Sequence, residues 1–120
     1  MDSNQLKNRT KSFSIVILDL VEKLPNTISG RAVSNQIVRS GTSVGANYRA
    51  VCRARSDKEF IAKVGVVIEE VDETLFWLEI IQAKSRVDNT NLAPILIEAN
   101  ELTSIFVSSV KTIKQRISKS

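Results

Sequence analysis

Apolar residues recur at intervals of three, four or seven positions in four stretches of this chain, with short polar segments between them. The first stretch covers about residues 3–23, and its recurring apolar residues are Leu6, Phe13, Ile17, Leu20 and Leu24. Such spacing gathers the apolar side chains on one side of an α-helix. Pro25-Asn26-Thr27 follows and predicts that this helix ends in a turn.

The second stretch, about residues 28–53, keeps the helical pattern although Gly41 and Gly45 lie inside it. Each glycine lowers helix propensity by about 1 kcal/mol relative to alanine. We interpret the pair as a bend or a close helix crossing, because a missing Cβ lets two backbones approach. A ligand-binding loop is the alternative, but the segment lacks the Lys-Ser/Thr that completes a phosphate-binding loop.

The third and fourth stretches cover about residues 57–85 and 91–118. Ser56 and Glu59 fit a capping box, in which Ser56 accepts the Glu59 N–H and the Glu59 side chain reaches back. Asn91 is the expected N-cap of the fourth helix, which would place Pro94 in its first turn. Four long helices with short connections predict an all-α, antiparallel, up-down-up-down four-helix bundle. We expect residues 1–120 to form this single domain.

The third helix carries more apolar residues than one core can cover. Those outside its main stripe include Val66, Ile68, Phe76 and Trp77. A helix that is apolar on two faces must bury both, whereas a four-helix monomer has only one inner face. Scattered surface hydrophobes are normal, but these cluster. We therefore predict that the protein is a homo-oligomer and that these four residues form its interface.

Polar residues interrupt the apolar pattern of the second and third helices, among them Arg39, Asn47, Glu70 and Glu73. Arg39 and Glu73 lie at equal distances before and after Ser56, so antiparallel helices would bring them together. We predict a charge-assisted pair between Arg39 and Glu73 or Glu70. Its expected role is to set the register of the helices as a buried or interfacial pair. A catalytic use of the two carboxylates is the alternative.

The composition removes most catalytic chemistry. The chain has no histidine, and Cys52 is its only cysteine. These absences exclude Ser-His-Asp and Cys-His catalysis and the common zinc sites. We expect no catalytic residues, no metal and no cofactor, and therefore no enzymatic activity. The N-terminus lacks the apolar core of a signal peptide, and the apolar runs are too short to span a bilayer, so we expect a cytoplasmic protein without a membrane partner.

Charge is segregated along the chain, which carries a formal net charge of +4. No acidic residue occurs between Glu22 and Asp57, and a second basic run ends the chain. Lys7, Arg9 and Lys11 form a third basic run near the N-terminus. Segregated positive charge is typical of nucleic-acid binding, although a solvated face would look similar. The candidate nucleic-acid-binding residues are Arg31, Arg49, Arg53, Arg55, Lys111 and Lys114.

Two blocks of residues resemble a known family. The first consists of Gln36, Arg39, Ser40, Ser43, Val44, Ala46 and Asn47. The second consists of Ser56, Lys58, Glu59, Phe60, Lys63, Glu70, Glu73, Thr74, Trp77 and Leu78, and Leu24-Pro25 also fits. This pattern resembles the bacterial 23S rRNA intervening-sequence proteins, also called S23-type ribosomal or four-helix-bundle proteins. Val51-Cys52 departs from it, because many relatives carry an acidic residue followed by glycine or alanine there.

The resemblance implies an up-down four-helix bundle that assembles as a ring, most often a pentamer, without enzymatic activity. Related bundles act as accessory factors of diversity-generating retroelements, where they bind a reverse transcriptase and nucleic acid. Two hypotheses follow. The first is a basic oligomeric scaffold that binds rRNA, other structured RNA or other nucleic acid through phosphate contacts. The second is an adaptor that docks a protein partner, such as a reverse transcriptase.

Overall fold

The computed structural model describes residues 1–119, which form four long α-helices and no strand. Their bounds are α1 Ser3–Val21, α2 Ile28–Val51, α3 Asp57–Ala83 and α4 Asn89–Ser118. Each helix agrees with the sequence prediction at one end and differs by two residues at the other. The all-α, four-helix prediction is therefore confirmed.

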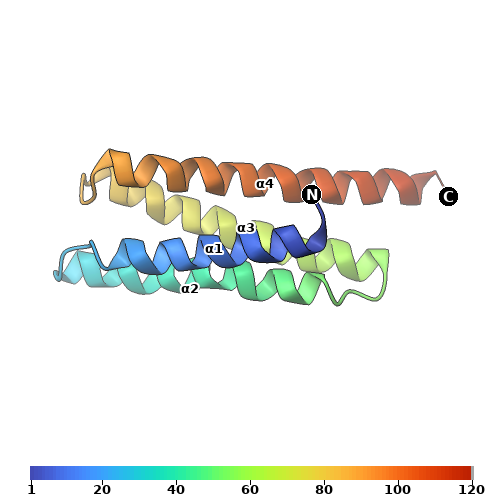
Figure 1. Ribbon diagram of the computed structural model, residues 1–120, viewed down its shortest axis with the longest axis horizontal. Coiled ribbons are helices and arrows are strands. Elements are labelled where there is room, and N and C mark those ends of the chain that lie inside the picture. Colours follow the sequence, from blue (N-terminus) through green and yellow to red (C-terminus); the bar gives the residue numbers. More distant parts are fainter. Residues whose placement is uncertain (120) are drawn as a thin grey trace.

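The four helices lie along the long axis of a molecule that measures 54 × 22 × 20 Å. Figure 1 shows that successive helices are joined at alternate ends of this axis. Each helix packs along the next one in the chain, whereas α4 touches α1 only over a short region. The helices thus surround one core, which is more open between α1 and α4.

Local capping contacts explain where the helices begin. Asp2 Oδ1 accepts the Gln5 N–H at 2.8 Å, and the Gln5 side chain accepts the Asp2 N–H at 2.9 Å. Ser56 accepts the Glu59 N–H at 3.0 Å as predicted, but the Glu59 carboxylate reaches the N–H of Arg55 rather than that of Ser56. Each contact satisfies an N–H group that has no partner within its helix.

The predicted start of α4 is wrong. Asp88 rather than Asn91 is the N-cap, and its carboxylate accepts the Thr90 N–H at 3.1 Å. Pro94 consequently lies in the second turn of α4 instead of the first. The preceding end of α3 is closed by Ser85, whose positive φ of 52° lets Arg86 donate back to the Ile81 carbonyl. This short connection leaves only a few residues between the two helices.

The close approach of α1 and α2 confirms the interpretation of the two glycines. Ser14 Oγ donates to the Gly41 carbonyl at 2.8 Å, and the Gly45 N–H donates to Ser14 Oγ at 3.3 Å. A Cβ atom on Gly41 would lie 2.8 Å from Cγ2 of the buried Ile17. The helix runs unbroken through both glycines, so the segment is a helix crossing and not a loop.

An ionic cluster joins α1 to α4. Arg9 donates from Nε and Nη2 to the two carboxylate oxygens of Glu98, at 2.8 and 2.6 Å, and Nη2 also donates to Glu101 at 2.5 Å. The hydrogen bond to Glu98 is the main cause that raises the pKa of Arg9. The N-terminal basic run is therefore split, because Arg9 is paired with two carboxylates and is not a free cation.

Replacing Arg9 with methionine is expected to lower the free energy of unfolding by about 1–3 kcal/mol, since it removes charge-assisted hydrogen bonds and leaves two carboxylates together. Urea denaturation followed by circular dichroism measures the change. Lys11→Met, at an exposed position of the same helix, is the control and should change stability much less. Equal stability of the two variants would mean that the cluster does not hold α4 to α1.

Candidate nucleic-acid interface

Five of the six predicted nucleic-acid-binding residues gather at one end of the bundle. They are Arg49 in α2, Arg53 and Arg55 in the connection after it, and Lys111 and Lys114 near the end of α4. Figure 1 shows that α2 and α4 both end on this side of the molecule. All five side chains are exposed. We call this group the basic end.

Arg31 does not belong to this group. It lies in the first turn of α2, and a helical rise of about 1.5 Å per residue puts it about 27 Å from Arg49. Its guanidinium donates instead to Asn26 Oδ1 at 3.0 Å, in the turn between α1 and α2. The sequence could not separate Arg31 from the others, because charge counting along the chain ignores which end of a helix a residue occupies.

The side chains of the basic end have no carboxylate partner among residues 1–119. Some cations elsewhere are engaged, namely Arg39 with Glu73, Lys63 with Glu59, and Arg116 with Asp57, whereas others, such as Arg31, also form no ion pair among residues 1–119. Only Arg49 of the five lies in the last turn of a helix, where a cation would stabilise the helix dipole. Stabilisation of helix ends thus does not explain the group. Cations without a partner can instead neutralise the phosphates of a nucleic acid and release the counterions condensed on it.

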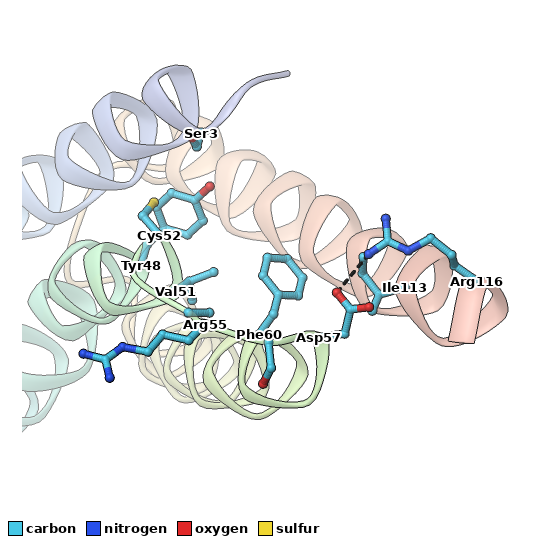
Figure 2. Close-up of a pocket in the computed structure, with 11 residues that line it drawn as sticks. Ser3, Tyr48, Val51, Cys52, Arg55, Asp57, Phe60, Ile113 and Arg116 are labelled. Atoms are coloured by element: carbon cyan, nitrogen blue, oxygen red, sulfur yellow. Dashed lines mark hydrogen bonds and ion pairs between the residues drawn. The ribbon is translucent and has the colours of Figure 1, made fainter. Parts of the chain in front are cut away.

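A cavity of about 490 Å³ opens at the basic end. Its lining comes from Ser3, Tyr48, Val51, Cys52, Ala54, Arg55, Ser56, Asp57, Phe60, Ile113 and Arg116. Figure 2 shows the ion pair between Arg116 and Asp57, 2.9 Å long, at its side. Arg55 extends away from the Phe60 ring. The cavity therefore has an apolar floor, a balanced ion pair and unpaired cations nearby.

Tyr48 forms part of this floor. Its ring packs against Phe106 with 5.5 Å between ring centroids. Burial, together with the adjacent Cys52, raises the pKa of Tyr48. The hydroxyl is protonated at neutral pH, as in any tyrosine, and can act as a hydrogen-bond donor or acceptor. The cavity is not predictable from sequence patterns, because its lining residues come from the ends of all four helices and from the connection between α2 and α3, which only packing brings together.

A second polar region follows the contact between α2 and α3. Arg39 Nη2 donates to Glu73 Oε1 at 2.6 Å, and Arg39 Nη1 lies 4.0 Å from Glu70 Oε2. The pairing partner is the one expected, but the pair is not buried: the Arg39 side chain is 53% exposed. Asn47, two turns further along α2, is half-buried. An exposed pair of this kind stabilises the fold by at most about 1 kcal/mol.

The buried polar contact of this region was not predicted from the sequence. Ser40 and Thr74 are completely buried, and their hydroxyl oxygens lie 2.8 Å apart. Thr74 is also 2.8 Å from the Glu70 carbonyl, so each hydroxyl has a partner. Their positions next to Arg39 and Glu73 in the chain were the available signal. A satisfied buried pair of hydroxyls favours one register over its neighbours.

Glu70 is the residue of this region whose hydrogen bonding is incomplete. One of its carboxylate oxygens is buried and has no hydrogen-bond partner within residues 1–119. Burial raises the pKa of Glu70 and the Glu73 carboxylate adds to this, while Arg39 opposes it. The folded protein therefore favours the protonated form of Glu70 more than the unfolded chain does.

Because of this raised pKa, the Glu70 carboxyl should cost stability as pH increases. The free energy of unfolding should fall as pH rises from below the ordinary glutamate pKa of about 4.3 through the raised value. Glu70→Gln is expected to remove this decrease and to be more stable than the wild type at neutral pH. Urea denaturation between about pH 3 and 8 tests this, with the exposed Glu79→Gln as control. Parallel curves for wild type and Glu70→Gln would contradict it.

The four predicted interface residues divide into two pairs. Val66 is 43% exposed and Phe76 is 52% exposed, as a second apolar face requires. Ile68 and Trp77 are instead half-buried and pack against the core. The Trp77 ring meets the Phe76 ring edge-on, with 4.9 Å between centroids. Ile68 and Trp77 are thus less available for a subunit contact than Val66 and Phe76, and the interface itself stays a prediction.

None of the helices found between residues 1 and 119 is both long enough and apolar enough to cross a membrane. A comparison with curated proteins finds no match. A crystal structure of a protein of unknown function from the S23 ribosomal protein family, from Bacteroides thetaiotaomicron, is similar to this fold with a TM-score of 0.81. The two sequences are 31% identical, and the similarity covers 88% of this chain and 98% of the other.

The sequence itself matches the same family, because residues 2–108 match the family described as 23S rRNA-intervening sequence protein. That match spans α1, α2, α3 and most of α4, including the regions that carry Arg39, Ser40, Glu70 and Thr74. The chain therefore belongs to the 23S rRNA intervening-sequence protein family.

Proposed function

We propose that this protein is a non-catalytic scaffold that binds structured RNA or other nucleic acid through phosphate contacts at the basic end. The observation that carries the proposal is the group of five exposed cations without carboxylate partners. Each phosphate neutralised by such a side chain releases condensed counterions, and this release drives association. The family description also refers to 23S rRNA, which makes structured rRNA the first ligand to test.

We further propose that the scaffold acts as a homo-oligomeric ring in the cytoplasm, with five subunits as the resemblance implies. The exposed Val66 and Phe76 support an interface on α3. Around a closed ring the basic end would be repeated once per subunit. Repetition would multiply the number of phosphate contacts and raise the avidity for a long RNA without any new type of contact.

The test is titration of a structured rRNA fragment at several salt concentrations. Binding is expected to weaken steeply with added salt, because its free energy comes from counterion release. Arg53→Glu and Lys114→Glu should each weaken binding and reduce the slope of log affinity against log salt by about 1 or more. Arg31→Glu is the matched control, since Arg31 is exposed at the opposite end, and it should have little effect. Binding that does not respond to salt would contradict the proposal.

A protein-interaction adaptor is the second candidate function, and the exposure of Phe76 and Val66 favours it. In that role the apolar face of α3 would dock a partner such as a reverse transcriptase. Affinity purification after nuclease treatment separates the two functions. A partner that survives nuclease and is lost in Phe76→Glu would support the adaptor, whereas a partner lost with the RNA would support the scaffold.

A further inference from the structure

The cavity at the basic end exists because the helices differ in length. α1 has 19 residues and α4 has 30, so α4 extends beyond the first residue of α1. Figure 1 shows the last turns of α4 running past the N-terminus of the chain. There the end of α2, the start of α3 and the last turns of α4 line a space that α1 reaches only with its first residue, Ser3. The apolar side chains of Phe60 and Ile113 are consequently only half-buried.

The cavity has room for a flat ring and an aromatic side chain in its wall. Figure 2 shows the Phe60 ring projecting into the space between Tyr48 and Ile113. The volume of about 490 Å³ is within the usual range for small-molecule sites, about 300–1,000 Å³. An aromatic side chain with aliphatic neighbours can stack any nucleobase, because every base has a π face.

Polar groups surround this apolar floor. Tyr48 contributes a hydroxyl, Ser3 contributes another, and Asp57 contributes a carboxylate. Such groups can donate to or accept from the edge of a base that is not paired with another base. The Tyr48 hydroxyl is protonated at neutral pH, as in any tyrosine with the ordinary pKa of about 10.

The charge arrangement favours a neutral ring inside the cavity and phosphates outside it. Within the cavity the Asp57 carboxylate is balanced by Arg116 at 2.9 Å. The Arg55 side chain points away from the Phe60 ring, and Arg53 is exposed nearby. A nucleotide whose base entered the cavity would thus leave its phosphates close to unpaired cations.

We propose that this cavity binds one unstacked nucleobase, with Phe60 as the stacking platform and Tyr48 as a hydrogen-bonding group at the base edge. The inference rests on the proposed RNA-binding function and names the part of the RNA that the site would take: a base in a loop, in a bulge or at a free end. A free nucleotide has the same chemistry, and the experiment distinguishes these two sources.

The test uses a short single-stranded RNA that contains 2-aminopurine, whose fluorescence reports stacking. Wild-type protein is expected to change this fluorescence on binding. Phe60→Leu keeps an apolar side chain on α3 but loses the aromatic ring, and should weaken binding about 5- to 100-fold. Ile97→Val, a similarly small change at an exposed apolar position outside the cavity, should leave binding unchanged. Thermal melting of both variants verifies that they fold.

A second variant, Tyr48→Phe, removes only the hydroxyl and should alter the preference among oligo(A), oligo(C) and oligo(U) while stacking persists. Adenosine monophosphate is titrated in parallel. If it binds and this binding depends on Phe60, the free nucleotide is an occupant; if only RNA binds in this manner, the base belongs to RNA. Both results support the base site.

The proposal that the cavity binds a base, here called the base site, and the proposal that the protein is an RNA-binding scaffold can be contradicted independently. If Arg53→Glu weakens RNA binding but Phe60→Leu changes neither affinity nor 2-aminopurine fluorescence, the base site is overturned and the scaffold stands. If wild-type protein shows no salt-dependent RNA binding but binds adenosine monophosphate through Phe60, the scaffold is overturned and the base site stands. If neither ligand depends on Phe60, the cavity does not bind bases.

Discussion

Phe76→Glu is expected to reduce the mass of the protein in solution from that of an oligomer to that of the 13.3-kDa monomer. The Phe76 side chain is 52% exposed, so the substitution disturbs few contacts within the subunit. Burying such a ring between subunits stabilises an assembly by up to about 1.5–3 kcal/mol for each ring. A buried, unpaired carboxylate in its place would cost several kcal/mol, on the order of 3–5 per site. Size exclusion coupled to light scattering gives the mass directly.

The neighbouring Trp77 makes the experiment more specific. Trp77 packs against the core, and its indole Nε1 is buried, so Trp77→Glu should unfold the subunit rather than separate folded subunits. Phe76→Glu should keep its helical circular dichroism while its mass decreases. Ile97→Glu on α4 is the matched control, because Ile97 is 58% exposed but lies on another helix. A wild-type monomer at tens of micromolar, or a Phe76→Glu protein of unchanged mass, would exclude the interface on this face.

The second large effect concerns the helix crossing of α1 and α2. Gly41→Ala is expected to lower the free energy of unfolding by about 1–3 kcal/mol, because the new Cβ would overpack the core. It would lie within 3.0 Å of three atoms of Ile17, a fully buried and β-branched residue with little freedom to move. The cost should exceed the gain in helix propensity, which is about 1 kcal/mol at most.

Gly65→Ala is the matched control for this substitution. A Cβ on Gly65, in the middle of α3, would have no neighbour within 4 Å. The variant should therefore show only the gain in helix propensity and be more stable than wild type by about 1 kcal/mol. Thermal and urea denaturation of both variants measure the difference. If both alanine variants are equally stabilised, the close approach of α1 to α2 is not a constraint on the fold.

Much of the fold was predictable because its determinants are local. Apolar spacing and the turn at Pro25 placed the four helices to within two residues at their ends. The register of Arg39 against Glu73 followed from their equal distances to Ser56. Local rules failed where two caps compete within a few residues, as at the start of α4, where Asp88 caps in place of Asn91.

The candidate site was predictable only in part. The sequence identified the basic residues, but counting charge along a chain cannot tell that Arg31 lies at the far end of α2 from Arg49. Nor could it tell that Arg9 is engaged by Glu98, which is distant in the chain. Both distinctions depend on which helices meet, and over what part of their length.

The sequence alone determined the number of helices, their order and the family, because periodicity, caps and motifs are read from neighbouring residues. The tertiary structure decided how α3 divides its many apolar side chains, packing Trp77 half-buried against the core and leaving Phe76 exposed. It also created the cavity at Phe60, because α1 and α4 differ in length and only packing shows which turns remain uncovered. Burial is a property of the space between helices, and no pattern along one helix specifies it.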